Sequence, residues 1–149
     1  MEGVPHPIMF SDDDPVLNRV RAIALAFPTA TEQVAHGRPT FRCPKMFGMY
    51  GGGEKNPAKG VPGRRFDQSL LVVADPAERE ALLADERFFL PAYMGAYGWV
   101  GLILDENSDW TEVGELLDAS FRQVAPKRTV AELDAKGSVG EKSGSLGDE

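Results

Sequence analysis

Residues 36–66 concentrate positive charge, and their side chains could hold a polyanion. The segment contains seven Lys and Arg residues against one acidic residue, Glu54, which gives a net charge of +6. Lysine and arginine neutralise phosphates and release the counterions of a nucleic acid, so the segment predicts a nucleic-acid-binding surface. The phosphate contacts that we expect from it are Arg38, Arg42, Lys45, Lys59, Arg64 and Arg65.

A histidine and several aromatic residues could instead line a pocket for a small ligand. Histidine titrates near neutral pH and can act as a base or a ligand, while aromatic rings offer a stacking surface. The structural alternatives are a strand-end histidine bonded to the backbone and aromatic packing in the core and its corners. The pocket residues that we consider are His36, Tyr93, Tyr97 and Trp99.

Groups that could support covalent or metal catalysis are sparse. The single cysteine, Cys43, excludes an intrachain disulfide framework and a zinc site built from several thiolates. The two histidines, His6 and His36, form no metal-ligand motif, and no activating partner for Cys43 is apparent. We therefore expect no catalytic residue, metal or cofactor, and the sequence disfavours an enzyme.

The glycine-rich run within residues 51–65 resembles a phosphate-binding loop only in composition. It lacks the G-x-x-x-x-G-K-[ST] spacing and lies between two predicted strands, so we expect a hairpin tip with basic side chains. Arg42 and Lys45 are an odd number of residues apart and would face opposite sides of a regular strand. A bulge at Pro44 would decide whether they form one basic stripe.

Apolar periodicity predicts the elements that position these residues. Helical spacing follows the Asp14–Pro15 start over residues 15–27, again over about 77–84, and again after Asp109 up to Pro126. Strand patterns cover residues 31–37, 40–50, 69–75, 87–95 and 99–106. We expect helices to bury one face of a sheet with the core residues Val20, Ile23, Phe27, Leu71, Val73, Leu102, Leu104, Leu117, Phe121 and Val124.

The 149 residues suit one domain, and their net charge of −7 opposes strong bulk attraction to nucleic acid or anionic membranes. No apolar run is long enough for a membrane helix, and no secretory signal is visible, so we expect a cytoplasmic protein with no membrane partner. We divide the chain into an N-terminal extension, 1–14, a domain, 15–133, and a disordered tail, 134–149.

Three phrases, HGRPTFRCPKMFGMY, ERFFLPAYMGAYGWVGLILDE and DWTEVGELLDASFRQVAPKR, give the sequence a resemblance to the MmcQ/YjbR family of small bacterial proteins over about residues 15–133. The resemblance implies an α+β fold, a two-layer α-β(3)-α-β(2)-α domain with one antiparallel sheet, similar to type III secretion chaperones. The family is commonly described as predicted DNA-binding, with a double-wing or CyaY-like arrangement. The 51–65 loop is longer than the short hairpin typical of the family.

Three hypotheses for function follow from the residues and the resemblance. The first is a non-enzymatic protein that binds nucleic acid, DNA in particular, weakly through the basic hairpin segment. The second is a protein- or peptide-binding module whose sheet accepts an added strand. The third is a small-ligand binder or enzyme with a pocket near His36. A contiguous positive face would favour the first and a large apolar groove the second. The oligomeric state stays open.

Overall fold

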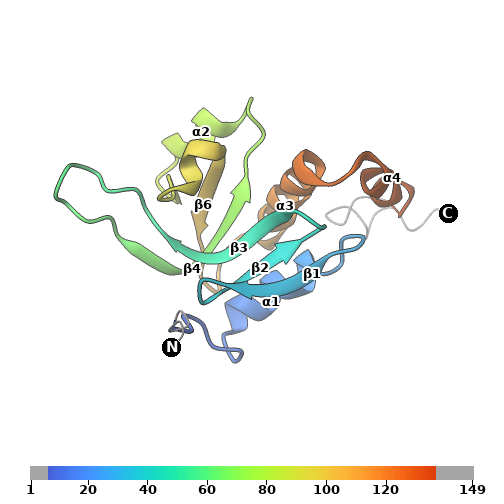
Figure 1. Cartoon of the computed structure of the whole chain (residues 1–149), viewed down its shortest axis with the longest axis horizontal. Coiled ribbons are helices and arrows are strands. Elements are labelled where there is room, and N and C mark those ends of the chain that lie inside the picture. The colour runs from blue at the N-terminus through green and yellow to red at the C-terminus, as the bar shows by residue number, and fades with distance from the viewer. Residues whose placement is uncertain (1–6, 137–149) are drawn as a thin grey trace, which may run out of the picture.

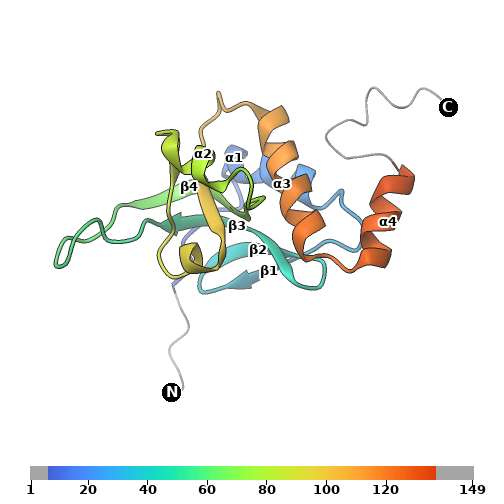
Figure 2. The same cartoon turned by 90° about the horizontal axis from the view of Figure 1, so that it is seen from above.

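One face of a six-stranded antiparallel sheet packs against two helices, as Figures 1 and 2 show from two sides. The computed structural model describes residues 7–136, so the predicted disorder of the last residues, 137–149, lies outside the described part. The sheet order is β1-β2-β3-β4-β6-β5, which confirms the α+β fold. The elements are α1 (Pro15–Ala24), β1 (Thr31–Ala35), β2 (Arg38–Arg42), β3 (Met46–Gly53), β4 (Arg65–Val73), α2 (Arg79–Ala84), β5 (Phe88–Phe89), the 3-10 helix η1 (Met94–Tyr97), β6 (Trp99–Ile103), α3 (Trp110–Val124) and α4 (Lys127–Lys136).

The element count differs from the predicted one at three places. The strand expected over 40–50 is two strands, because the chain turns at Cys43, Pro44 and Lys45 and the Cys43 amide donates to the Lys45 carbonyl at 2.8 Å. The strand expected over 87–95 shortens to β5, because the chain leaves the sheet at Pro91 and then forms η1. A further helix, α4, follows α3 and extends to Lys136, so residues 134–136 of the tail predicted over 134–149 are helical.

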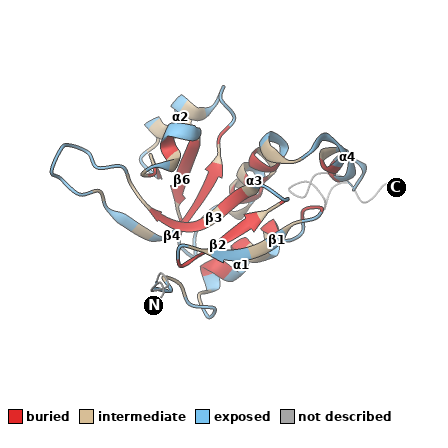
Figure 3. Cartoon of the chain, viewed as in Figure 1, coloured by how far each residue is buried: buried red, intermediate tan, exposed pale blue. Residues whose placement is uncertain are grey.

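The core between the sheet and the helices α1 and α3 contains most of the predicted residues, and Figure 3 shows buried positions on both layers. Six of the predicted residues are buried there: Val20, Phe27, Leu102, Leu104, Leu117 and Phe121. Ile23 and Val124 are only half-buried at its margin. The placement of Leu71 and Val73 under the helices was wrong, since both belong to a smaller apolar cluster with Phe89 and Trp99.

The starts of α1 and α3 agree with the cap signals in the sequence, whereas α2 begins at Arg79, later than predicted, and Glu78 before it makes no side-chain cap bond. Asp14 precedes α1, and its carboxylate accepts hydrogen bonds from the amides of Val16 and Leu17. Asp109 caps α3 in the same way. Within residues 7–136, no helix is both long enough and apolar enough to cross a membrane. In the same part of the chain, no three His, Cys, Asp or Glu side chains are arranged to hold a metal ion.

We expect Cys43 to resist alkylation in the folded protein. The residue is 1% exposed, and burial raises the pKa of its thiol to about 11. At pH 8 only about one such thiol in a thousand is ionised, and the thiolate is the reactive form. Iodoacetamide should therefore modify the native protein far more slowly than the urea-unfolded chain, as mass spectrometry over time can measure. Equal rates in the two states would contradict the burial of this thiol.

Candidate binding groove

The face of the sheet opposite α1 and α3 carries a groove of about 780 Å³ over β2 and β3. Its floor is apolar and comes from Met46, Met49 and Leu71 together with two glycines, Gly52 and Gly53. A Cβ on Gly52 would lie 2.9 Å from Leu71 Cδ2, so glycine keeps this part of the floor flat. The groove thus lies on the sheet face that the helices leave uncovered.

Arg38 forms a wall of this groove and is almost wholly buried. Its side chain is 7% exposed, and Nη2 donates to Asp67 Oδ1 at 3.1 Å. The guanidinium lies against Gly51, where a Cβ would overlap Nη1 and where φ is +86°, so two separate reasons require glycine. Nη1 is buried and has no hydrogen-bond partner among residues 7–136. Arg38 therefore shapes the groove instead of reaching a phosphate in solvent.

Arg42 lines the same groove, four residues further along β2 than Arg38, and is half-buried. Its Nε donates to Thr40 Oγ1 at 3.1 Å, and within residues 7–136 it forms no ion pair. A register irregularity follows Phe41, and the turn after it carries Lys45 outside the groove as an exposed cation. The basic stripe considered for Arg42 and Lys45 is therefore not formed within the groove.

The hairpin between β3 and β4 projects from the sheet, and carboxylates hold two of its cations (Figure 1). Arg64 makes a bidentate ion pair with Glu54 and lowers the pKa of that carboxyl through hydrogen bonding. Arg65 pairs with Asp67 at 3.0 Å. Lys59 lies exposed near the tip and forms no ion pair with any described residue. The predicted +6 charge already includes Glu54, and Asp67 reduces it further through its pairs with Arg38 and Arg65.

His36 lies in the two-residue turn between β1 and β2 and also lines the groove. His36 and Gly37 have φ values of +54° and +82°, the pattern of a type I′ turn, which matches the twist of a hairpin. The structure therefore places His36 at a strand end, as the structural alternative supposed, and at the edge of the groove, as the pocket hypothesis supposed.

Tyr93 is the most exposed large side chain at the groove, at 92%. Its φ of 64° and ψ of −55°, with the Met94 amide donating to the Ala92 carbonyl at 2.6 Å, define a γ-turn of the rare form with positive φ. For a bulky residue this conformation is strained, and such strain is concentrated at functional sites. The turn holds an aromatic ring in solvent at the edge of the groove.

The other two aromatic residues of the predicted pocket lie elsewhere. Tyr97 is 81% exposed, but it does not line the groove. Trp99 is 8% exposed and packs in the smaller apolar cluster on this face of the sheet. Of the four residues predicted for the pocket, the structure therefore places His36 and Tyr93 at the groove and Tyr97 and Trp99 outside it.

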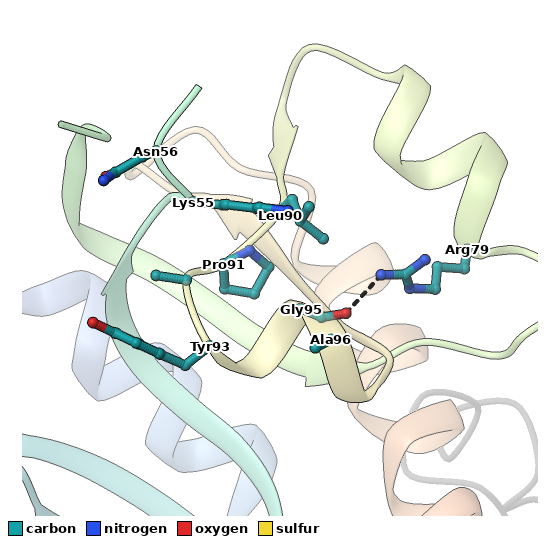
Figure 4. Close-up of a pocket in the computed structure, with 9 residues that line it drawn as sticks. Lys55, Asn56, Arg79, Leu90, Pro91, Tyr93, Gly95 and Ala96 are labelled. Atoms are coloured by element: carbon teal, nitrogen blue, oxygen red, sulfur yellow. Dashed lines mark hydrogen bonds between the residues drawn. The ribbon is translucent and has the colours of Figure 1, made fainter. Parts of the chain in front are cut away.

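A second cavity of about 560 Å³ adjoins the groove at Ala92 and Tyr93, which line both. Two cations, Lys55 and Arg79, line it, as Figure 4 shows. Sequence reasoning missed this site. The available signal was that Arg79 is the only basic residue between 67 and 86, a stretch rich in Asp and Glu.

Comparison with known proteins points to one family. The sequence model of the YjbR family matches residues 25–123. The fold is similar to the crystal structure of a Deinococcus radiodurans protein, DR2400, described as having a DUF419 domain. The TM-score is 0.52 at 17% identity, over 79% of this chain and 87% of that one. No curated protein matches the sequence.

Proposed function

The chain belongs to the YjbR family, and we propose that it is a non-enzymatic protein that binds single-stranded nucleic acid in the groove on its open sheet face. The observation that carries the proposal is Tyr93, whose ring is held in solvent at the groove edge by a strained turn. Aromatic rings on a sheet surface stack on bases without regard to sequence. DNA is the first form to test.

The cations around the groove can contact the phosphates of a strand whose bases lie on its floor. Arg42 lines the groove without a carboxylate partner among residues 7–136. Lys45 is exposed three residues after it in the sequence, and Lys55 is exposed at the adjoining cavity. These side chains replace Arg38, Arg64 and Arg65 as the expected phosphate contacts, because the latter three already pair with Asp67 or Glu54. An ion-paired arginine must lose its partner before it can bind a phosphate.

A single strand fits this face better than a duplex does. Sequence reading in a duplex usually needs a helix or a two-stranded ribbon in the major groove. Here α1 and α3 cover the opposite face of the sheet, so neither projects from the groove. With a net charge of −7 on the whole chain, we expect weak binding that is sensitive to salt.

A peptide is the second candidate for the same groove, and the apolar floor is the feature that the sequence analysis expected to favour it. Two methionines, Met46 and Met49, form part of an apolar floor, and flexible methionine side chains suit partners of varied shape. β1 is an edge strand that pairs only with β2 among the described strands, so its outer edge could accept an added strand.

Replacing Tyr93 with Ala should weaken binding of a fluorescein-labelled oligothymidylate by about 5- to 150-fold, because one stacked base contributes about 1–3 kcal/mol. Fluorescence anisotropy at low salt measures this. Tyr97→Ala is the matched control, since Tyr97 is 81% exposed and lines neither cavity. Equal affinities of the Tyr93→Ala and Tyr97→Ala variants would show that no base stacks on Tyr93. Absence of binding by the unaltered protein would favour the peptide.

The salt dependence separates Arg42 from the hairpin arginines. With three or four phosphates neutralised, log K for a single strand should fall with log salt with a slope of about −2 to −3. Arg42→Gln should reduce the magnitude of this slope by about 0.7, whereas Arg64→Gln should leave it nearly unchanged because Glu54 already holds that side chain. A larger change in slope for Arg64→Gln than for Arg42→Gln would show that the hairpin, not the groove, binds the phosphates.

A further inference from the structure

We propose that the cavity lined by Lys55 and Arg79 is a separate site for a terminal phosphate monoester. The phosphate could belong to a free mononucleotide or to the phosphorylated end of a strand. The site adjoins the groove and shares Ala92 and Tyr93 with it, but it does not require the groove to bind a strand. The proposal rests on the charge of the residues that line the cavity, on the unsatisfied donors of Arg79 and on the apolar wall beside them.

The residues that line this cavity carry a net positive charge, whereas the chain as a whole is negative. The sequence has 23 acidic and 16 basic residues, yet the cavity has two cations, Lys55 and Arg79, and no acidic residue. Within residues 7–136, neither cation forms an ion pair. Six arginines of the same part of the chain do form one, among them Arg64, Arg87 and Arg122. Lys55 and Arg79 are two of several cations without an ion pair in this part of the chain, and they share one cavity whose lining contains no carboxylate.

Arg79 is fixed in position but has most of its donors unused. Its Nη2 donates to the Gly95 carbonyl at 2.7 Å, as Figure 4 shows, which aligns the guanidinium along the segment 90–96. Its Nε is buried and has no acceptor in the described structure. A guanidinium has five N–H donors in a planar fork that suits phosphate oxygens. One side of this fork is held by the backbone, and Nη1 makes no hydrogen bond to a described residue.

Lys55 approaches the cavity from the opposite side. Its backbone amide donates to the Leu90 carbonyl at 2.8 Å, which fastens the base of the β3–β4 hairpin to the segment that carries Tyr93. Figure 4 shows the Lys55 and Arg79 side chains on either side of this segment, with Leu90 near the end of the lysine. An anion that reaches either cation would gain charge-assisted hydrogen bonds, which are stronger than neutral ones.

The rest of the lining suits an organic phosphate better than the bare ion. Leu90, Pro91 and Tyr93 provide apolar and aromatic surface beside the cations. The volume of about 560 Å³ lies within the range of ligand pockets and exceeds the need of inorganic phosphate. A base or sugar attached to the phosphate could therefore contact the wall that Tyr93 shares with the groove.

Isothermal titration calorimetry on the full chain tests the site with four probes: adenosine 5′-monophosphate, adenosine, and an oligothymidylate with and without a 5′-phosphate. We expect the monophosphate to bind and adenosine not to, or the 5′-phosphate to tighten binding of the oligonucleotide. The first result assigns the site to a free nucleotide and the second to a strand end. Lys55→Gln should weaken the phosphate-dependent binding about tenfold.

The matched control is Lys59→Gln. Lys59 is an exposed lysine on the same hairpin and lines neither cavity, so its loss should leave phosphate-dependent binding within about twofold. If the phosphate changes nothing on either probe, or if the two lysine variants weaken binding equally, the inference is overturned. Binding of the unphosphorylated oligonucleotide would still support the groove proposal. Binding of the monophosphate alone would support this site and overturn the groove.

Discussion

Replacing Phe121 with Ala should lower the free energy of unfolding by about 3–5 kcal/mol. The side chain is fully buried at the centre of the helix-facing core. Its ring centroid lies 5.0 Å from that of Phe27 and 5.2 Å from that of Phe47, so α3, β3 and the loop after α1 all contact it. The substitution removes these contacts and leaves a cavity among rigid neighbours. Urea denaturation followed by circular dichroism measures the change.

Tyr97→Ala serves as the comparison for this prediction. It also removes an aromatic ring, but from a side chain that is 81% exposed, so the free energy of unfolding should change by less than about 0.5 kcal/mol. A loss below about 1 kcal/mol for Phe121→Ala would mean that the three-ring cluster does not exist in solution.

The helices could be predicted because their ends carry local chemistry. Asp14 before Pro15, and Asp109 three residues before Glu112, are cap signals that depend only on neighbouring residues. The structure has both caps, with the aspartate oxygens accepting from the following amides. The strands were harder to delimit, because apolar alternation continues through residues 40–50 and does not reveal the turn at Cys43–Lys45.

Where a stretch of a strand is apolar at every position, the sequence also could not show which of its residues face the helices. The run from Leu70 to Val73 has no polar residue, so the sequence offers no alternation to assign its faces. In the sheet, Leu70 and Val72 meet the helices, while Leu71 and Val73 lie on the opposite face. The floor of the groove therefore includes a residue that the sequence placed in the main core.

The residue types of the candidate site could be predicted from the sequence, but most of the ion pairs that its arginines form could not. The basic residues were visible as a cluster, yet the ion pair of Arg64 with Glu54 depends on hairpin register, and that of Arg38 with Asp67 joins β2 to β4. Arg65 and Asp67 were two residues apart on one strand, so that pair was within reach of the sequence.

The positive φ of Tyr93 leaves no local signal in the sequence, because a bulky residue in that conformation is unexpected. Surrounding contacts impose it. The Ala92 amide donates to the Gly53 carbonyl, and the Gly95 amide donates to the Pro91 carbonyl, each at 2.9 Å. The ring is thus positioned by the base of the basic hairpin, which couples the stacking residue to the cations that would bind phosphates.

Replacing Asp14 with Ala should lower the free energy of unfolding by about 2–4 kcal/mol, because one carboxylate supports both a helix start and a buried phenol. Its Oδ1 caps α1 and accepts from Gln68 Nε2 at 3.1 Å, while Oδ2 accepts from the Tyr50 hydroxyl at 2.7 Å. Tyr50 is 1% exposed, and burial, followed by the Asp14 carboxylate, raises the pKa of its phenol. The substitution leaves that hydroxyl without its acceptor. Urea denaturation at neutral pH measures the loss.

Asp109→Ala separates the helix-cap contribution to this loss from that of the hydrogen bonds with Tyr50 and Gln68. Asp109 caps α3 through the amides of Thr111 and Glu112, as Asp14 caps α1, but the hydrogen bonds of its side chain go to the helix start alone. Its removal should cost about 1 kcal/mol, the usual value for an N-cap. The excess for Asp14→Ala, about 1–3 kcal/mol, then measures the lost hydrogen bonds of the buried Tyr50 hydroxyl and of the exposed Gln68 amide together. Adding Tyr50→Phe to Asp14→Ala should recover part of that excess, because the orphaned hydroxyl is removed. Equal losses for the two aspartate variants would show that the link between α1 and β3 contributes nothing to stability.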